Sequence, residues 1–141
     1  MRALIALSVA ALLLPGCETA FVGRAPAGRY ELVEVNGRAV PHERRTAAGC
    51  SATVESGHFD LDALARRFEL ALRERGECWG GNVHESRENG TYLRRGGRLT
   101  LEALDAEGRR RTWIASESGD AVALEHQGMR LRFRQTERQR P

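Results

Sequence analysis

The segment MRLRFRQ, residues 129–135, alternates apolar and charged side chains along most of its length. Met129, Leu131 and Phe133 fall on one side of an extended chain, and three arginines fall on the other. Because successive side chains of a β-strand point to opposite faces of a sheet, this alternation predicts a strand with one buried face. It is the clearest sign of an all-β fold in the chain.

Shorter segments with the same period-two alternation precede it, separated by turn residues such as Asn36-Gly37, Gly96-Gly97 and Gln127-Gly128. The expected strands cover residues 30–35, 51–54 continuing through 58–61, 68–72, 90–93, 98–104, 112–115, 121–126 and 129–135. No segment predicts a helix, because residues 62–67 are too few for more than a turn. The pattern therefore predicts an antiparallel meander of seven or eight strands.

One hairpin allows its register to be predicted. Placing Leu61 opposite Phe68 also places Phe59 opposite Leu70, with all four side chains on the inner face. A one-residue bulge at Glu55-Ser56-Gly57 would explain why the inward positions change parity between Val54 and Phe59. The same bulge would bring Cys50 opposite Cys78.

The N-terminus reads as a secretory leader. Ala3–Leu14 is a run of twelve residues in which only Ser8 is polar, too short for the roughly 20 residues of a membrane-spanning helix. Leu14, Gly16 and Cys17 resemble the bacterial lipobox, although Pro15 departs from its usual pattern. The resemblance implies cleavage before Cys17 and acylation of its thiol. The alternative is ordinary cleavage that leaves Cys17 as a free thiol.

This reading divides the chain into a lipoprotein signal peptide (1–16), a lipidated tether (17–28), a β-domain (29–136) and a short tail (137–141). Glu18 follows Cys17 where inner-membrane lipoproteins usually carry Asp. The expected location is therefore the cell envelope, on the outer membrane and facing the periplasm. There, Cys50 and Cys78 are expected to form a disulfide, with a metal pair or a catalytic thiol as alternatives.

Two stretches resemble small lipocalin-like and META-type bacterial domains. They are GRYELVEVNGRAVP (residues 28–41) and the pair NGTY and GGRLTL (residues 89–92 and 96–101). The resemblance implies an up-and-down antiparallel barrel, often found on lipoproteins. These families supply no catalytic residue to carry over.

Candidate chemical groups are scattered. His42, His58, His84 and His126 are each expected at the surface, with His58 pointing outward. The pairs Asp60 with Asp62 and Glu74 with Glu77 are interpreted as solvated charges rather than as acid-base couples. Trp79 lies beside Cys78 where a barrel mouth is expected, either as packing or as a ligand contact. We expect no catalytic residue, metal site or cofactor.

The net charge of +3 is too small to indicate a nucleic-acid partner. Arg109–Arg111 and the outward Arg130, Arg132 and Arg134 are interpreted as solubilising, edge-protecting charges, with contact to anionic headgroups as the alternative. The oligomeric state is left open.

The expected function is a non-enzymatic, membrane-anchored lipoprotein whose barrel binds a protein or an envelope component. The alternative is a carrier of a small apolar ligand, which would require an apolar cavity above about 300 Å³. A hydrolase ranks last. Bulky inward residues favour a filled interior and hence the first reading; they are Tyr30, Leu32, Phe59, Leu61, Phe68, Leu70, Leu72, Tyr92, Leu99, Leu101, Trp113, Leu124, Leu131 and Phe133.

Overall fold

The computed structural model describes residues 27–138, and the chain there is almost entirely β-strand. The strands are β1 (Gly28–Val35), β2 (Arg38–Ala39), β3 (His42–Arg45), β4 (Ser51–Asp62), β5 (Arg67–Gly76), β6 (Val83–Arg95), β7 (Arg98–Leu104), β8 (Arg110–Ser118), β9 (Ala121–His126) and β10 (Met129–Arg138). One short 3₁₀ helix, η1 (Glu77–Trp79), joins β5 to β6. None of the helical segments in residues 27–138 is long and apolar enough to span a bilayer.

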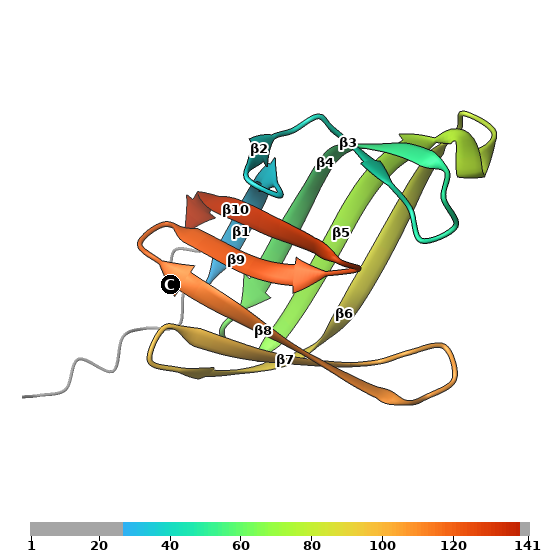
Figure 1. Cartoon of the computed structure of the whole chain (residues 1–141). Coiled ribbons are helices and arrows are strands. Elements are labelled where there is room, and N and C mark those ends of the chain that lie inside the picture. The colour runs from blue at the N-terminus through green and yellow to red at the C-terminus, as the bar shows by residue number, and fades with distance from the viewer. Residues whose placement is uncertain (1–26, 139–141) are drawn as a thin grey trace, which may run out of the picture.

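Eight strands, β1 and β4 to β10, form a closed antiparallel barrel (Figure 1). Consecutive strands from β4 to β10 are neighbours, and β10 then pairs with β1. Pairing of β1 with β4, in which Tyr30 lies opposite Phe59, closes the ring. This confirms the predicted all-β meander and its barrel closure.

The predicted β4–β5 register is also confirmed. Leu61 lies opposite Phe68 and Phe59 opposite Leu70. The register shifts by one residue between Val54 and Ser56, which places the bulge where the change of inward parity required it.

The inward residues form one continuous core. Its aromatic centre consists of Tyr30, Phe59, Phe68 and Phe133. The centroid of the Phe59 ring lies 5.8 to 6.4 Å from the centroids of the other three rings. All the inward residues expected from the sequence belong to this core, Trp113 at its partly buried margin.

The barrel has two distinct ends. At one end, which we call the entry end, β1 begins, β10 finishes, and the β4–β5, β6–β7 and β8–β9 turns gather (Figure 1). The opposite end, which we call the disulfide end, carries β3, the loop before β4, η1 and the β9–β10 turn.

Two features of the fold were missed by the sequence pattern. The short strands β2 and β3 lie where no strand was expected, and β6 begins at Val83 rather than at residue 90. The first half of β6 has no apolar alternation, because its inward positions are His84, Ser86 and Glu88, which lie opposite Glu74, Leu72 and Leu70 of β5. Hydrophobic periodicity identifies a strand only where the face it covers is apolar.

Gly90 marks the point at which β7 crosses closely over β6. A Cβ atom at this position would overlap the carbonyl oxygen of Glu102 on β7. Beyond this point β6 pairs only with β5, and β7 continues with β8 as a separate hairpin. The barrel wall therefore opens toward the disulfide end.

Candidate functional site

A cleft of about 520 Å³ opens at the disulfide end of the barrel. Its walls come from β3 and the loop that follows it, from β5, η1 and β6, and from the β9–β10 turn. The residues that line it include Arg44, Glu74, Trp79, His84, Ser86 and Gln127. Its volume lies within the range of about 300 to 1,000 Å³ that is usual for small-molecule sites.

An ion pair lies at the base of the cleft. Arg44 Nε donates a hydrogen bond to Glu74 Oε1 at 2.7 Å, and Glu74 is only 2% exposed. The expectation that Glu74 is a solvated charge is therefore wrong. Side chains alternate between the two faces of β5, so Glu74, two residues after the buried Leu72, also points into the barrel. Glu77 is exposed, as expected. The pair leaves the other guanidinium N–H groups of Arg44 without a hydrogen-bond partner among the described residues.

Two stacked rings form one side of the cleft. The Trp79 and His84 rings lie 4.9 Å apart at an interplanar angle of 10°. Next to them, Cys50 and Cys78 form the expected disulfide, with Cα atoms 5.6 Å apart, and Thr46 Oγ1 lies 3.3 Å from Cys78 Sγ. The disulfide thus fastens η1 to the start of β4 and holds Trp79 at the rim.

His126 corrects the expectation of a surface histidine. It is 2% exposed, and neither ring nitrogen has a hydrogen-bond partner among the described residues. Burial, helped by the positive charges of Arg111 and Arg44 and opposed by Glu74, lowers the pKa of His126 to about 4. The imidazole is therefore neutral at physiological pH.

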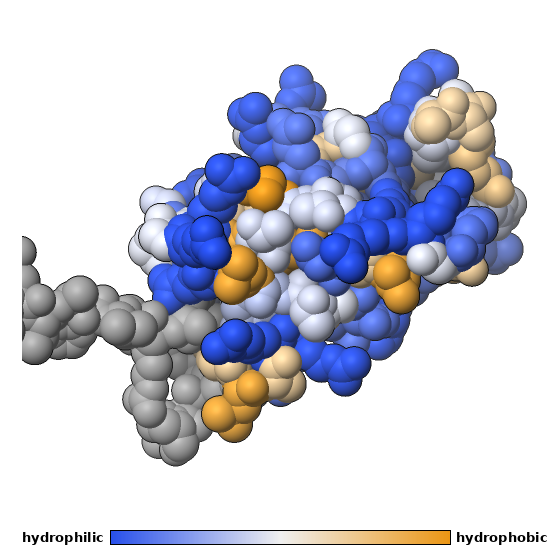
Figure 2. Space-filling model, turned by 90° about the horizontal axis from the view of Figure 1, so that it is seen from below, coloured by the Kyte–Doolittle hydropathy of each residue, from blue (hydrophilic) through white to orange (hydrophobic). Residues whose placement is uncertain are grey.

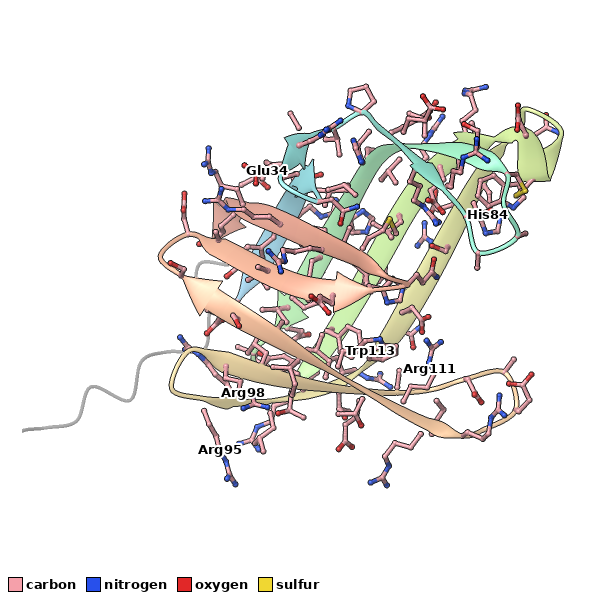
Figure 3. All side chains as sticks on the ribbon, viewed as in Figure 1. Glu34, His84, Arg95, Arg98, Arg111 and Trp113 are labelled. Atoms are coloured by element: carbon pink, nitrogen blue, oxygen red, sulfur yellow. A yellow bond between two sulfur atoms is a disulfide. The ribbon has the colours of Figure 1, made fainter. Side chains whose placement is uncertain are left out.

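Trp113 and Arg111 connect His126 to the opening in the wall. The Trp113 ring lies 5.8 Å from the His126 ring, and the Arg111 guanidinium lies 5.0 Å from the Trp113 ring centroid. Arg111 also forms a 3.4 Å ion pair with Glu88 of β6. Figure 3 shows Trp113 and Arg111 close together on β8, and the Arg111 side chain is 44% exposed. The disulfide end of the interior therefore holds buried polar groups beside apolar residues such as Val54 and Met129, in contrast to the aromatic centre toward the entry end.

Ser86, His84 and Glu74 converge on the cleft, but they do not form a catalytic triad. No hydrogen bond joins any two of them within residues 27–138. Glu74 is bonded to Arg44, and the His84 ring stacks on Trp79. A nucleophile needs its base within hydrogen-bond reach, so this arrangement gives no support to a hydrolase.

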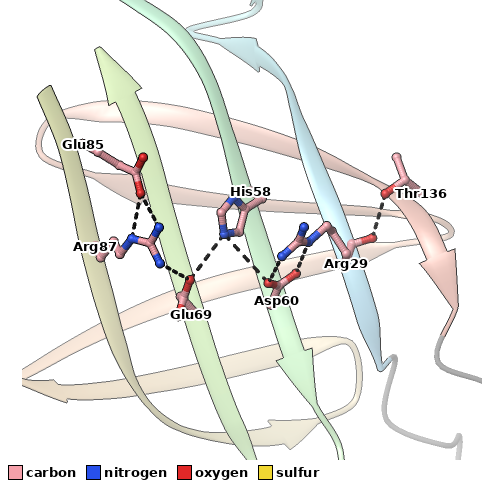
Figure 4. A network of polar contacts seen from close by, with 7 residues as sticks. All are labelled: Arg29, His58, Asp60, Glu69, Glu85, Arg87 and Thr136. Carbon is pink, nitrogen blue, oxygen red and sulfur yellow. Dashed lines mark hydrogen bonds and ion pairs between the residues drawn. The ribbon is translucent and has the colours of Figure 1, made fainter. Parts of the chain in front are cut away.

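A second polar cluster lies on the outer face of the barrel (Figure 4). His58, Asp60 and Glu69 place ligand atoms within 4.8 Å of one another, and His58 points outward as expected. Arg29 holds Asp60 with two hydrogen bonds of 2.8 and 2.9 Å, and Arg87 lies 3.4 Å from Glu69. Both carboxylates are thus already neutralised by arginine.

The arginines expected on the solvent face of β10 are each paired. Arg132 contacts Glu34 at 3.1 Å, Arg134 contacts Asp120 at 3.8 Å, and Arg130 contacts Glu125 at 3.9 Å. In the 109–111 run, Arg109 contacts Asp105 at 2.9 Å and Arg110 contacts Glu102 at 4.0 Å. These pairs favour the solubilising role over contact with headgroups.

The remaining predicted residue, Cys17, lies outside the described residues, as do the leader and nearly all of the tether. Of the residues that line the cleft, Arg44, Ser86 and Gln127 carried no signal in the sequence. The one usable hint was Trp79, placed beside the disulfide at an expected barrel mouth.

No family model matches the chain, and no curated protein matches it. Among solved structures, the chain is similar to a lipocalin-like protein from Bacteroides uniformis, with 19% sequence identity and a TM-score of 0.42, over 79% of this chain and 98% of that one.

Proposed function

We propose that the mature protein is a lipid-anchored envelope protein that binds a small, uncharged, amphipathic ligand in the cleft at its disulfide end, without catalysis. The observation that carries this proposal is the Arg44–Glu74 pair at the base of the cleft. Burying two charges in a barrel interior is costly, and a filled apolar core would not need them. A binding role accounts for a buried polar base beneath an open cleft.

The charges of the cleft suggest the chemistry of the ligand. Because the Arg44 and Glu74 charges offset each other, neither a cation nor an anion gains a net attraction there. Arg44 still offers N–H donors, which suit a carbonyl or amide oxygen. The stacked Trp79 and His84 rings and the neighbouring Ala47 and Ala48 offer contact to a flat apolar group.

A carrier of a wholly apolar ligand fits less well. The cleft exceeds the 300 Å³ that such a carrier would need, but its base is charged and it opens to the outside. The aromatic half of the interior is filled by its own side chains. An amphipathic ligand bound at the mouth is therefore favoured over a wholly apolar one held deep in the barrel.

A partner protein is the second candidate. Residues 83–90 of β6 pair only with β5, so the other edge of this half-strand has no partner among the described residues. Such an edge can accept an added strand from another chain. A photo-cross-linker at Val83 that captures one envelope protein reproducibly, and does so less when Ser86 is replaced by proline, would favour this candidate.

The ligand proposal can be tested with three probes that share one ring and differ in charge. Benzamide is expected to bind with a dissociation constant of roughly millimolar size, as measured by saturation-transfer difference NMR. Benzoate and benzylamine are expected to bind more weakly. W79A should reduce benzamide binding, whereas the matched exposed change L104A should not. Equal binding of all three probes, or an unchanged affinity in W79A, would contradict the proposal.

The anchor requires its own test. Protein extracted from the membranes of a bacterial host is expected to carry acyl chains at Cys17 by intact-mass analysis, and C17S is expected to lack them. Sucrose-gradient separation of the membranes tests the outer-membrane location. An unmodified Cys17 in the wild-type chain would refute the anchor without affecting the ligand proposal.

A further inference from the structure

The entry end of the barrel carries an arginine cluster that lacks counter-ions. Among the arginines from Arg29 to Arg134, most form an ion pair with a carboxylate within 4.0 Å, as Arg29, Arg73, Arg94 and Arg132 do. No such pair is formed by Arg66, Arg67, Arg95 or Arg98 at this end, where Asp62, the last residue of β4, lies opposite Arg67. The Asp62 carboxylate instead accepts hydrogen bonds from the backbone N–H groups of Leu64 and Ala65. Two further acids near this end, Asp120 and Glu117, are engaged by Arg134 and Arg94.

Two of these arginines face each other directly. Arg95 and Arg98 are cross-strand partners at the tip of the β6–β7 hairpin, and both are exposed. Figure 3 shows them at the tip, with Arg95 extending away from the barrel. Like charges opposite each other in a ladder destabilise a hairpin, so this pair has a cost that the fold itself does not offset.

Exposed apolar side chains accompany the charges. Leu64, in the β4–β5 turn, is 98% exposed, and Leu93 of β6 is half exposed. The β4–β5 turn adjoins β6 through a 3.0 Å hydrogen bond from Tyr92 N to Arg66 O. Figure 2, which views the molecule from below, shows apolar groups as separate spots among charged ones. Leucine beside unpaired arginine is the combination that suits a bilayer surface with anionic headgroups.

The chain also enters the barrel at this end. Gly28 pairs with Leu61, three positions before Leu64. Cys17 lies ten positions before Ala27, a separation that can span at most about 35 Å. An acyl group on Cys17 would therefore hold the entry end within about 35 Å of the membrane.

We propose that the entry-end surface, formed by Leu64, Arg66, Leu93, Arg95 and Arg98, rests on anionic phospholipid headgroups. This rests on the proposed anchor at Cys17. The bilayer supplies the counter-ions that these arginines lack, and the cleft at the disulfide end then faces away from the membrane toward its ligand.

The test uses the full-length lipidated chain reconstituted in vesicles, with one added tryptophan as a depth reporter. L64W places it at the entry end, and V83W is the matched control at the disulfide end, where Val83 is 37% exposed. In vesicles of brominated phosphatidylglycerol and phosphatidylcholine, the fluorescence of L64W should be quenched and that of V83W should not. Quenching of L64W should weaken at high salt.

Charge removal separates headgroup binding from simple proximity. R95Q/R98Q in the L64W background should lower the equilibrium constant for the surface-bound state about thirtyfold, whereas R38Q/R45Q at the other end should leave it unchanged. Equal quenching of L64W and V83W, or quenching that is insensitive to both salt and R95Q/R98Q, would overturn the inference. Circular dichroism checks that each variant folds.

Failure of the anchor can be told apart from failure of this surface. If intact-mass analysis shows an unmodified Cys17, the same unlipidated chain is mixed with the anionic vesicles. Salt-sensitive quenching of L64W that R95Q/R98Q abolishes would uphold the surface without the anchor. Absence of such quenching would overturn it.

Discussion

The Glu74 carboxylate accepts a hydrogen bond from Arg44 Nε at 2.7 Å at the disulfide end of the barrel, and the two side chains are only 3% and 12% exposed. Arg44 comes from β3 and Glu74 from β5, so β4 lies between them. Each charge depends on the other, because water reaches neither of them well enough to solvate it. The base of the cleft is thus a coupled pair of charges rather than two independent residues.

Removing one member of this pair is expected to destabilise the protein strongly. E74L leaves the Arg44 guanidinium shielded and unpaired, and should lower the free energy of unfolding by about 3 to 5 kcal/mol. The double variant R44M/E74L removes both charges and should lie within about 1 kcal/mol of the wild type. Urea denaturation followed by circular dichroism measures both. As a control, R132A breaks a pair in which Arg132 is 45% exposed and should cost less than about 1 kcal/mol.

His126 should make stability depend on pH. Its pKa is about 4 in the folded protein, against an ordinary value of 6.5, so the unfolded chain binds more protons between these two pH values. The contribution is complete above pH 6.5 and is lost as the pH falls toward 4, by about 3 kcal/mol in total. H126L should flatten this part of the curve of unfolding free energy against pH, whereas H58N should keep it. Parallel curves for wild type and H126L would contradict the assignment.

The Cys50–Cys78 disulfide should contribute a large share of stability. It joins residues 28 positions apart, and closing a loop of that length is worth roughly 3 to 4 kcal/mol in the chain-entropy model. C50S/C78S should lose that amount in urea denaturation, whereas C17S, which leaves the disulfide intact, should lose none. Alkylation of wild-type protein without reductant should find no free thiol at either position, and two reactive thiols there would exclude the bridge.

Gly90 should not tolerate a side chain. G90A places a methyl group against the Glu102 carbonyl and should push β7 away from β6, at a cost of about 2 kcal/mol or more. The adjacent N89A changes an exposed side chain and should stay within about 0.5 kcal/mol of the wild type. Thermal unfolding of the two variants side by side provides the measurement. Equal melting temperatures would mean that the strands do not cross closely here.

Prediction from sequence succeeded where the barrel is apolar. In this part of the barrel the residues that face the core are apolar, so a one-residue slip of the register would have exposed Phe59 and Leu61 together. The alternation therefore determined both the β4–β5 register and its bulge. It failed in the first half of β6 and at Glu74 and His126, where the interior is polar and inward residues look like surface ones.

The sequence by itself determined the all-β fold and the strands that build the core, because hydrophobic alternation is a local property of the chain. It also predicted the pairing of Cys50 with Cys78, because these two cysteines remain once Cys17 is assigned to the anchor. The lipid anchor at Cys17 remains a prediction from the same source. Only the tertiary structure decided where the polar interior lies. Arg44, Glu74 and His126 belong to three separate strands, and barrel closure brings them to one end. Closure shields their charges and ring nitrogens from water, and that loss of solvation distinguishes a buried polar site from the charged surface that the sequence alone suggested.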